Sequence, residues 1–395
     1  MSTRDAILTI NAGSSSIKFA LFPLDHPISP EAEVSGQIDG IGTSATKMVA
    51  KNRAGDKIAD TTIPGEKVTH DQAFDALLKW FLETQAGWRI VSVGHRVVHG
   101  GDRYSQPTVV DDTVLGHLIE FIPLAPLHEP HNVAGIRALQ ALLPDVPHVA
   151  CFDTAFHRTQ PEVAQLFGLP RSLTAEGIKR YGFHGLSYEY IARALPKHSH
   201  RANGRVIVAH LGNGASMAAM VNRKCVGTTL GFSTIDGLMM GTRCGNLDPG
   251  VVLHLMETKG WSVKDMTRIL YKESGLLGVS GISQDMRTLL ASDKPEAQQA
   301  VDLFCYRIVR ELGSLAAAAG GLDALVFTGG IGEHAAEVRR RVCLQLDWLG
   351  IRLNPEANAR NQIVIGAGDS SVDVLVIPTN EEWMMAHHAQ TLLAL

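Results

Sequence analysis

Apolar and polar residues alternate most clearly near the start of the chain. Ile7–Ile10 is a short apolar, β-branched run that predicts a buried strand, and small residues and turn formers follow it. The alternation then returns, with Ser14, Ser16 and Lys18 on the polar side of a second strand. The backbone N–H groups of a glycine turn, two hydroxyls and a lysine suit a polyphosphate, although an ordinary hairpin with a solvated polar face explains the pattern equally well.

The same pattern returns at residues 205–220, again as strand, Asn/Gly turn and strand. Asn11-Ala-Gly-Ser and Gly212-Asn-Gly-Ala-Ser occupy matching places in the two segments. Their distance along the chain suits two similar domains better than a solenoid. We therefore predict an internal duplication, and two such hairpins could hold the phosphates of a nucleotide.

Other apolar runs end in residues that carry chemistry. The run from Ile90 is expected to end at Gly94 and to deliver His95, Arg96 and His99 to a loop, and the run from Val149 ends in the carboxylate of Asp153. Strand ends of this kind are where open α/β sheets place ligands. A third run ends in two carboxylates, at 381 and 382, which are metal candidates if they lie at a buried strand end.

Helical periodicity is clearest at 73–82 and at 301–319, where Gly320-Gly321 ends the pattern. A proline-punctuated segment at 122–131 cannot be a regular helix, and a helix is expected from Asn132 to Leu142. His184 lies at the predicted start of another helix, where backbone N–H groups favour anions. Arg243 lies in a long glycine-rich loop, residues 283–287 form a polar turn, and 324–334 read as strand, glycine loop and helix start.

Composition sets limits on these hypotheses. A chain of 395 residues with 45% hydrophobic and 19% charged residues is expected to form two globular domains. A net charge of -4 does not favour a nucleic-acid partner held by bulk charge. The 5 cysteines include no C-x-x-C pair, which favours reduced thiols. With no apolar signal core and no run of membrane-spanning length, we expect a cytoplasmic protein without a membrane partner.

Eight motifs, taken in order, resemble the acetate kinase family over the full length of the chain. They are Asn11-Ala-Gly-Ser-Ser-Ser, Gly94-His-Arg-Val-Val-His-Gly-Gly, Phe152-Asp-Thr-Ala-Phe-His, Arg180-Tyr-Gly-Phe-His-Gly, His210-Leu-Gly-Asn-Gly, Met240-Gly-Thr-Arg-Cys-Gly, Gly330-Ile-Gly-Glu and Thr379-Asn-Glu-Glu. The resemblance implies the α/β fold of the acetate and sugar kinase/heat-shock/actin superfamily, with two duplicated domains that each have a mixed five-stranded sheet. It places the first domain at 1–153 plus the C-terminal helix at 382–395, and the nucleotide-binding second domain at 154–381. It also implies a homodimer.

The resemblance further implies ATP-dependent phosphorylation of acetate to acetyl phosphate, with ATP/ADP as co-substrate and Mg2+, or Mn2+ in its place, as cofactor. Its expected metal ligands are Asn11 and Glu381, with Glu382 as a weaker candidate. The expected catalytic residues are Arg96, Asp153, His184 and Arg243, and Arg96 also binds substrate. The expected methyl pocket is Val98, Leu127 and Phe183. The expected nucleotide and phosphate residues are Ser14, Ser16, Lys18, His210, Leu211, Gly212, Asn213, Gly214, Asp285, Met286, Arg287, Gly330, Ile331, Gly332, Glu333 and His334.

Three residues depart from the family pattern. Glu129 and His334 stand where Asn is usual, and Thr234 stands where Pro is common. Glu129 is expected to be peripheral, whereas His334 bears on nucleotide preference and Thr234 on the size of the acyl group. Two other functions fit the sequence: phosphorylation of propionate, and an actin-like or chaperone-like ATPase that would not require the two arginines and the histidine.

Overall fold

The computed structural model describes residues 3–85 and 87–395 of the chain. Two compact units are present, the first comprising Met1–Ala155 and Asn380–Leu395, and the second Phe156–Thr379. The units change over close to the predicted domain limits, at 155/156 and 379/380 rather than at 153/154 and 381/382. Within the described ranges, no helix is both long and apolar enough to span a membrane.

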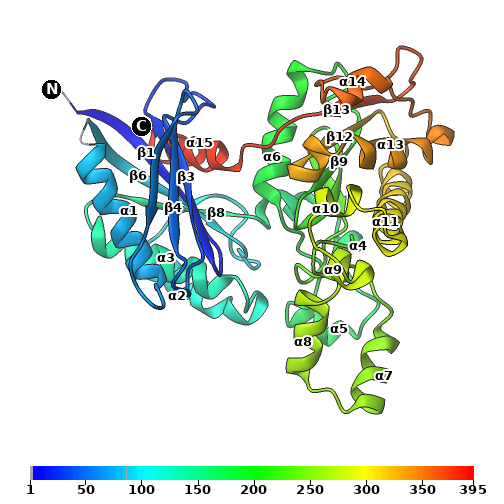
Figure 1. Cartoon of the computed structure of the whole chain (residues 1–395), viewed down its shortest axis with the longest axis horizontal. Coiled ribbons are helices and arrows are strands. Elements are labelled where there is room, and N and C mark those ends of the chain that lie inside the picture. Colours follow the sequence, from blue (N-terminus) through cyan, green and yellow to red (C-terminus); the bar gives the residue numbers. More distant parts are fainter. Residues whose placement is uncertain (1–2, 86) are drawn as a thin grey trace. The chain divides into compact units, whose positions relative to one another are not determined.

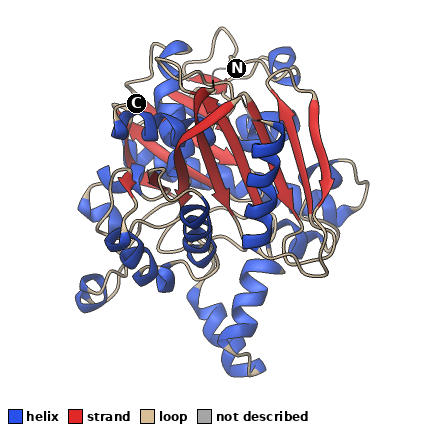
Figure 2. Ribbon diagram, turned by 90° about the vertical axis from the view of Figure 1, so that its left-hand side faces the viewer, coloured by secondary structure: helices blue, strands red, loops and turns tan. Residues whose placement is uncertain are grey.

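The first unit is built on a mixed sheet, which Figure 2 shows with its strands side by side. In the described residues its order is β5 (Lys57–Thr62), β4 (Lys47–Asn52), β3 (Val34–Asp39), β2 (Ser16–Pro23), β1 (Arg4–Ala12), β6 (Trp88–Val97), β8 (His148–Phe152) and β7 (Thr108–Val109). The predicted opening hairpin is confirmed: β1 and β2 are antiparallel, and Asn11 pairs with Lys18. β6 runs parallel to both β1 and β8.

The alternation along β1 separates the two faces of this sheet. Leu8 and Ile10 pack in a core with Phe74 and Leu77 of the predicted amphipathic helix. The helices of this unit are α1 (His70–Thr84), α2 (Asp112–Glu120), η1 (Ile122–Leu124), α3 (Glu129–Leu142) and α15 (Glu381–Leu393). α1 and α3 pack on the face that Leu8 and Ile10 line, and α15, red in Figure 1, contacts β1 and β6 from the opposite face.

The sheet of the second unit repeats the middle strands of the first sheet. Its sheet, in the described residues, has the order β11 (Lys224–Thr228), β10 (Ala215–Val221), β9 (Arg205–Leu211), β12 (Ala324–Thr328) and β13 (Asp373–Val376). Strand order and direction match those of β3-β2-β1-β6-β8. The predicted duplication is therefore confirmed at the level of topology, although the first sheet is larger than five strands because β4, β5 and β7 extend it.

Helices cover both faces of the second sheet. The helices described in this unit are η2 (Ala155–Thr159), α4 (Glu162–Gln165), α5 (Arg171–Ala175), α6 (Gly185–Ala194), η3 (Leu195–Lys197), α7 (Pro249–Lys259), α8 (Val263–Lys272), α9 (Gly275–Ser280), α10 (Met286–Leu290), α11 (Pro295–Ala319), α12 (Gly329–His334), α13 (Ala336–Leu344), η4 (Asp347–Leu349) and α14 (Pro355–Ala359). α6 packs on one face, through Tyr188 and Ile191, and α11 lies against the other (Figure 1). As predicted, α11 ends at Gly320, whose φ of 75° suits glycine.

Several predicted boundaries were wrong. β6 does not end at Gly94 but continues to Val97, because His95 and Arg96 still pair with β8. Gly94 instead lets α15 approach, since a Cβ atom there would lie 3.2 Å from that of Met385. α3 begins at Glu129 rather than Asn132, since a proline in the first turn of a helix breaks no hydrogen bond.

The other two corrections concern helix starts. Glu381 and Glu382 do not end a strand: β13 stops at Val376, and the two glutamates form the first turn of α15 with Asn380 as its cap. The glycine loop expected after β12 is itself helical, because α12 starts directly at Gly329.

Candidate functional site

Arg96 is the centre of a hydrogen-bonded group in the first unit. Its guanidinium donates from Nε to both carboxylate oxygens of Asp153 at 3.1 Å, and from Nη2 to Oδ2 at 2.5 Å. Nη1 donates to Asn11 Oδ1 at 3.1 Å. Arg96, Asp153 and Asn11 lie at the ends of β6, β8 and β1, so the parallel strands bring them to one edge of the sheet. We call these residues, with the nearby Glu381, the first cluster.

Electrostatic interactions within the first cluster are strong because Asp153 is only 1% and Arg96 20% exposed. Burial alone would lower the pKa of Arg96, but Asp153 and Glu381 outweigh it and raise that pKa above its ordinary value. Burial raises the pKa of Glu381 to about 7, and the positive charge of Arg96 opposes this shift. The cluster therefore combines a permanent cation with a carboxyl group that titrates near neutral pH.

Two side chains of α3 hold the backbone next to the first cluster. Asn132 accepts a hydrogen bond from the Val98 N–H at 3.0 Å and donates to the Ala12 carbonyl at 2.9 Å. Glu129 accepts from the His99 N–H at 3.2 Å. The prediction that Glu129 is peripheral is therefore wrong, because α3 starts early enough to place this side chain inside the protein, with 0% exposure.

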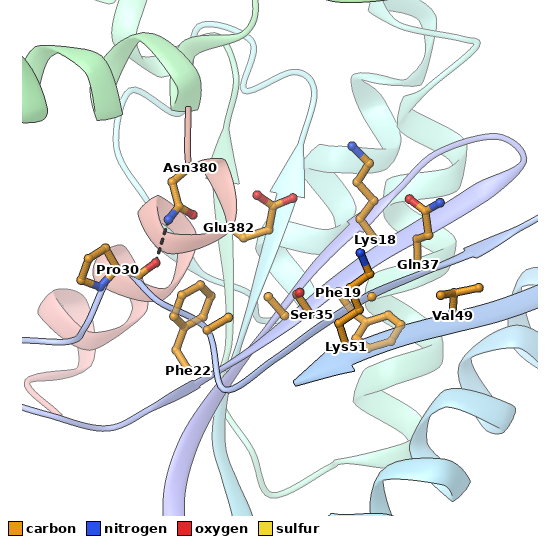
Figure 3. Close-up of a pocket in the computed structure, with 13 residues that line it drawn as sticks. Lys18, Phe19, Phe22, Pro30, Ser35, Gln37, Val49, Lys51, Asn380 and Glu382 are labelled. Atoms are coloured by element: carbon orange, nitrogen blue, oxygen red, sulfur yellow. Dashed lines mark hydrogen bonds between the residues drawn. The ribbon is translucent and has the colours of Figure 1, made fainter. Parts of the chain in front are cut away.

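The expected acyl residues of this unit differ in burial, since Val98 is 4% exposed and Leu127 is half-buried. Ser14 is exposed in the turn, and Ser16 begins β2. Lys18 lies on the outward face of β2 and borders a cavity of about 630 Å³ whose wall includes Glu382. Figure 3 shows both side chains at this cavity, together with Lys51 and Gln37 on the neighbouring strands. Lys18 thus presents its ammonium group to this cavity.

The second unit has a group of imidazoles and hydroxyls at the corresponding edge of its sheet. His184 Nδ1 lies 2.8 Å from Ser216 Oγ, which also lies 2.5 Å from the Tyr188 hydroxyl. His210 Nδ1 lies 2.8 Å from Ser187 Oγ, and the rings of His184 and His210 stack at 4.5 Å. His184 has a φ of 60° at the cap of α6, a conformation that is uncommon for a non-glycine residue. We call these five residues, with Arg243, the second cluster.

Gly214 joins Arg243 to this cluster. A Cβ atom at Gly214 would lie 3.2 Å from Arg243 Nη2 and 3.3 Å from His184 Nε2, so both side chains approach the turn between β9 and β10. Arg243 Nη1 donates to the Thr234 carbonyl at 2.6 Å. The backbone carbonyl of Asn213 accepts a hydrogen bond from the Gly241 N–H at 3.0 Å, which connects the same turn to the loop that carries Arg243. The glycine in the turn is therefore needed for close packing of the two side chains.

The first turn of α12 lies beside β9, since Thr328 pairs with His210. Glu333 Oε1 accepts hydrogen bonds from the Gly329 N–H at 2.9 Å and the Thr379 N–H at 3.1 Å, and Thr379 Oγ1 donates to Ser187 Oγ at 2.9 Å. The predicted residues of the β9–β10 turn, His210, Leu211, Gly212, Asn213 and Gly214, thus lie next to those of α12, Gly330, Ile331, Gly332, Glu333 and His334.

Other expected residues of the second unit lie as follows. Phe183 is buried, and its carbonyl lies 2.8 Å from His157 Nε2. Asp285 caps α10 ahead of Met286 and accepts from the Arg287 N–H at 2.8 Å. Arg287 is 91% exposed, and His334 is 76% exposed. These two side chains are open to solvent.

The oxygen donors of the first cluster suit a hard cation. Among the described residues, no three His, Cys, Asp or Glu side chains form a group that could hold a metal by themselves. Mg2+ commonly takes one or two protein oxygens and completes its shell with water and substrate phosphates. The desolvated carboxylate of Glu381 and the amide oxygen of Asn11 fit that requirement, and a nearby cation would counter the raised pKa of Glu381.

Sequence reasoning missed Ser216, Tyr188, Ser187, Thr379 and Asn132. Ser216 closes the second glycine turn motif and pairs with His210, so the internal repeat could have identified it. Ser187 and Tyr188 follow His184 within one helical turn. Their contacts with residues of β9 and β10 depend on how α6 packs on the sheet, which the sequence does not show. Asn132 was recognised only as a helix residue, because its two backbone partners are far away in the sequence.

Comparisons with known proteins agree on one relationship. The profile of the acetokinase family matches residues 6–387. The acetate kinase of Rhodopseudomonas palustris is 55% identical over 389 residues, which are 97% of each chain. The structure of a propionate kinase from Francisella tularensis matches with a TM-score of 0.90 at 38% identity, over 99% of this chain and 100% of the other. The Porphyromonas gingivalis acetate kinase matches with a TM-score of 0.88 at 36% identity, over 98% and 100%.

Proposed function

The chain belongs to the acetokinase family, and we propose that it is an acetate kinase that transfers the γ-phosphoryl group of ATP to acetate. An oxygen of the acetate carboxylate attacks the γ-phosphorus, and the bond from that phosphorus to the β–γ bridging oxygen breaks. The products are acetyl phosphate and ADP. Acetate is already ionised near neutral pH, so the reaction needs no general base. It needs positioning and neutralisation of charge instead.

The observation that carries this proposal is the fixed guanidinium of Arg96. Asp153 and Asn11 hold it in one orientation, and such a planar fork suits a carboxylate or a phosphoryl group. We assign Arg96 to the acyl carboxylate or the transferring phosphoryl group. Since both oxygens of Asp153 accept from Arg96, Asp153 acts as the residue that orients the cation rather than as a base.

The second cluster supplies further positive and hydrogen-bonding groups. We assign His184 and Arg243 to stabilisation of the charge that develops on the phosphoryl group. Both side chains approach Gly214, in the glycine turn between β9 and β10 that we expect to bind phosphate. The turn at 210–214 and the start of α12 would bind the nucleotide through backbone N–H groups. Asp285, Met286 and Arg287 are the remaining residues of this nucleotide assignment.

Mg2+ is part of the proposal, with Asn11 and Glu381 as the residues that would hold it. When bound, the cation would neutralise charge on the β- and γ-phosphates. Glu381 must be ionised to contribute, so its raised pKa of about 7 makes this carboxylate sensitive to pH in the absence of the cation. A homodimer in the cytoplasm completes the proposal, from the family resemblance and from composition.

Acetate-dependent formation of ADP tests the function. A coupled assay with purified protein, ATP and Mg2+ should show ADP formation that requires acetate, and acetyl phosphate should be recovered as hydroxamate. ADP formation that is independent of any acid would instead indicate an actin-like ATPase.

Propionate phosphorylation is the second candidate, since one solved structure at 38% identity is that of a propionate kinase. The same assay with acetate, propionate and butyrate separates the two, through kcat/KM for each acid. We expect acetate to be the best substrate, propionate second and butyrate poor, because one methylene changes the free energy of binding in an apolar pocket by only about 1–3 kcal/mol.

A further inference from the structure

Glu129 is a buried carboxyl group for which the reaction described above has no use. Its side chain is 0% exposed, and Oε2 accepts a hydrogen bond from the His99 N–H at 3.2 Å. Oε1 has no hydrogen-bond partner in the part of the chain that the structure describes. An ionised carboxylate in such surroundings is strongly unfavourable unless a cation or several donors face it. The geometry therefore favours the protonated, uncharged acid.

The backbone groups that hydrogen-bond to side chains of α3 indicate the role of Glu129. Asn132 and Glu129 lie one helical turn apart, and they bind two consecutive backbone N–H groups, those of Val98 and His99. These N–H groups follow directly on the end of β6, the strand that carries Arg96. The segment after Arg96 is thus fixed by two side chains of one helix.

The charged groups near Glu129 make its charge state important. Asp153 is the nearby anion, and its charge is matched by the guanidinium of Arg96. Of the charged groups, Asp153 acts on Glu129, and Arg96 pairs with Asp153. α3 itself and the elements that contact it carry further titratable side chains: His99 after β6, His128 beside Glu129, His131 stacked on His70 of α1, and His117 of α2 hydrogen-bonded to Tyr104. Burial, only partly offset by the His99 N–H, and then the charge of Asp153 raise the pKa of Glu129 to about 8.

We propose that Glu129 is a positioning residue for Arg96 that works in its uncharged form. Uncharged, it holds the His99 backbone and the segment after β6 in place. When Glu129 is charged, it adds a second buried negative charge near Asp153. The two carboxylates then compete for the electrostatic interaction with Arg96, and this segment loosens. This inference rests on the proposed function, because that function gives Arg96 its role in binding acetate or the phosphoryl group.

The test compares the pH dependence of wild type with that of Glu129→Gln, which keeps the shape of the neutral acid. Glu83→Gln, an exposed position on α1, is the matched control. We expect kcat/KM for acetate in the wild type and the control to fall between about pH 7.5 and about pH 9.5, approaching tenfold per pH unit above the pKa. Glu129→Gln should retain activity within about threefold at neutral pH and lack this alkaline decrease. KM for ATP should change little in any of the three.

Thermal unfolding tests the protonation state of Glu129 independently of enzyme activity. Since the pKa of Glu129 is higher in the folded chain than its ordinary value of 4.5, the folded chain holds a proton that the unfolded chain releases. Stability therefore falls as pH rises from about 4.5 to about 8. Between about pH 6 and about pH 8, Tm of the wild type should decrease by roughly 5 °C more than that of Glu129→Gln.

Two results would overturn the proposal. One is an alkaline decrease in Glu129→Gln equal to that of the wild type. The other is a folded Glu129→Gln protein that is inactive at neutral pH, which would mean that the charged form is needed. If the wild type forms no ADP in response to acetate, the proposed function fails instead, and the difference in Tm still decides whether Glu129 holds its proton.

Discussion

The two clusters occupy the same place in two copies of one topology but use different chemistry. The first cluster lies at the ends of β1, β6 and β8 and is built on the ion pair of Arg96 and Asp153. The second lies at the ends of β9 and β10 and is built on hydroxyl and imidazole groups around Ser216, with Arg243 beside them. The shared fold therefore determines where functional side chains gather, and the side chains determine what each site can bind.

The difference predicts how each cluster responds to mutation. Removing one member of a buried ion pair leaves an uncompensated charge, which reduces both folding stability and function. Removing one member of a network of hydroxyl and imidazole hydrogen bonds should lower the free energy of unfolding less, by about 1–3 kcal/mol for each group left without a partner. The variants below test this contrast.

Arg96→Ala should have the largest effect. Loss of an oriented cation is expected to reduce kcat/KM for acetate by at least about 100-fold, and the unpaired Asp153 should lower the free energy of unfolding by roughly 3 kcal/mol. Arg96→Lys should also lose most activity, since an ammonium cannot replace the planar fork. Steady-state kinetics and urea unfolding measure the two effects.

The double variant Arg96→Ala/Asp153→Asn separates stability from activity. Removing both charges should restore much of the stability and none of the activity, because the buried side chain at position 153 no longer carries an unpaired charge. Arg89→Ala on the same strand, where the ion pair with Asp5 is exposed, is the matched control and should change stability by less than about 1 kcal/mol. Near-normal turnover of Arg96→Ala would remove the first cluster from the mechanism.

Arg243→Ala tests the second cluster. We expect kcat to fall by about 100-fold, since a cation beside His184 is lost from the transition state. The decrease in stability should be smaller than for Arg96→Ala, because the 2.6 Å hydrogen bond to Thr234 joins the cation to a neutral carbonyl. Arg268→Ala, an exposed arginine on α8, is the control and should keep wild-type kinetics. Equal losses of stability in the Arg96 and Arg243 variants would contradict the contrast between the clusters.

Local patterns in the sequence predicted much of the fold. The β1–β2 and β9–β10 hairpins, α1 and α11 follow from alternation, helical periodicity and glycine stops, because burial of one face fixes each of them locally. The end of β6 was wrong because Gly94 looked like a strand end. Its real role, the close approach of α15, depends on a helix from the far end of the chain.

The candidate residues were also identified unevenly. Arg96 and Asp153 stood out because each ends an apolar run, and the structure brings them together. Glu129 was misjudged because only the packing of α3 shows that it is buried. Hydrogen bonds between segments distant in sequence, such as those of Asn132, leave no local pattern and need the folded chain to be seen.

Glu381→Ala tests the metal assignment within the first cluster. We expect the Mg2+ concentration needed for half-maximal rate to rise and kcat to fall, each by about tenfold, because one of few protein oxygens for the cation is lost. Glu382→Ala, the neighbouring residue in the same helical turn, is the matched variant and should change the Mg2+ requirement less. Activity should be titrated with Mg2+ at constant ATP. An unchanged requirement in Glu381→Ala together with a raised one in Glu382→Ala would transfer the ligand role to Glu382.

Val98→Ala should have the smallest effect and concerns the acyl group. Val98 is 4% exposed and directly follows the strand of Arg96, so its methyl groups are candidates for contact with the methyl group of acetate. Shortening it should admit one more methylene, whose burial contributes roughly 0.8 kcal/mol. We therefore expect the ratio of kcat/KM for propionate to that for acetate to rise by about three- to tenfold.

The control for this variant must separate the shape of the pocket from a general loss of packing. Val133→Ala, at a similarly buried valine of α3 in the same unit, removes the same two methyl groups and should lower stability by a similar amount, of about 1–2 kcal/mol. It should leave the ratio between the acids unchanged. If both variants change the ratio equally, loosened packing explains the effect. If Val98→Ala alone leaves it unchanged, Val98 does not line the acyl pocket. If the wild type already prefers propionate, the protein is a propionate kinase. The effect of Val98→Ala would then be measured with butyrate, because an enlarged pocket favours the next longer acid.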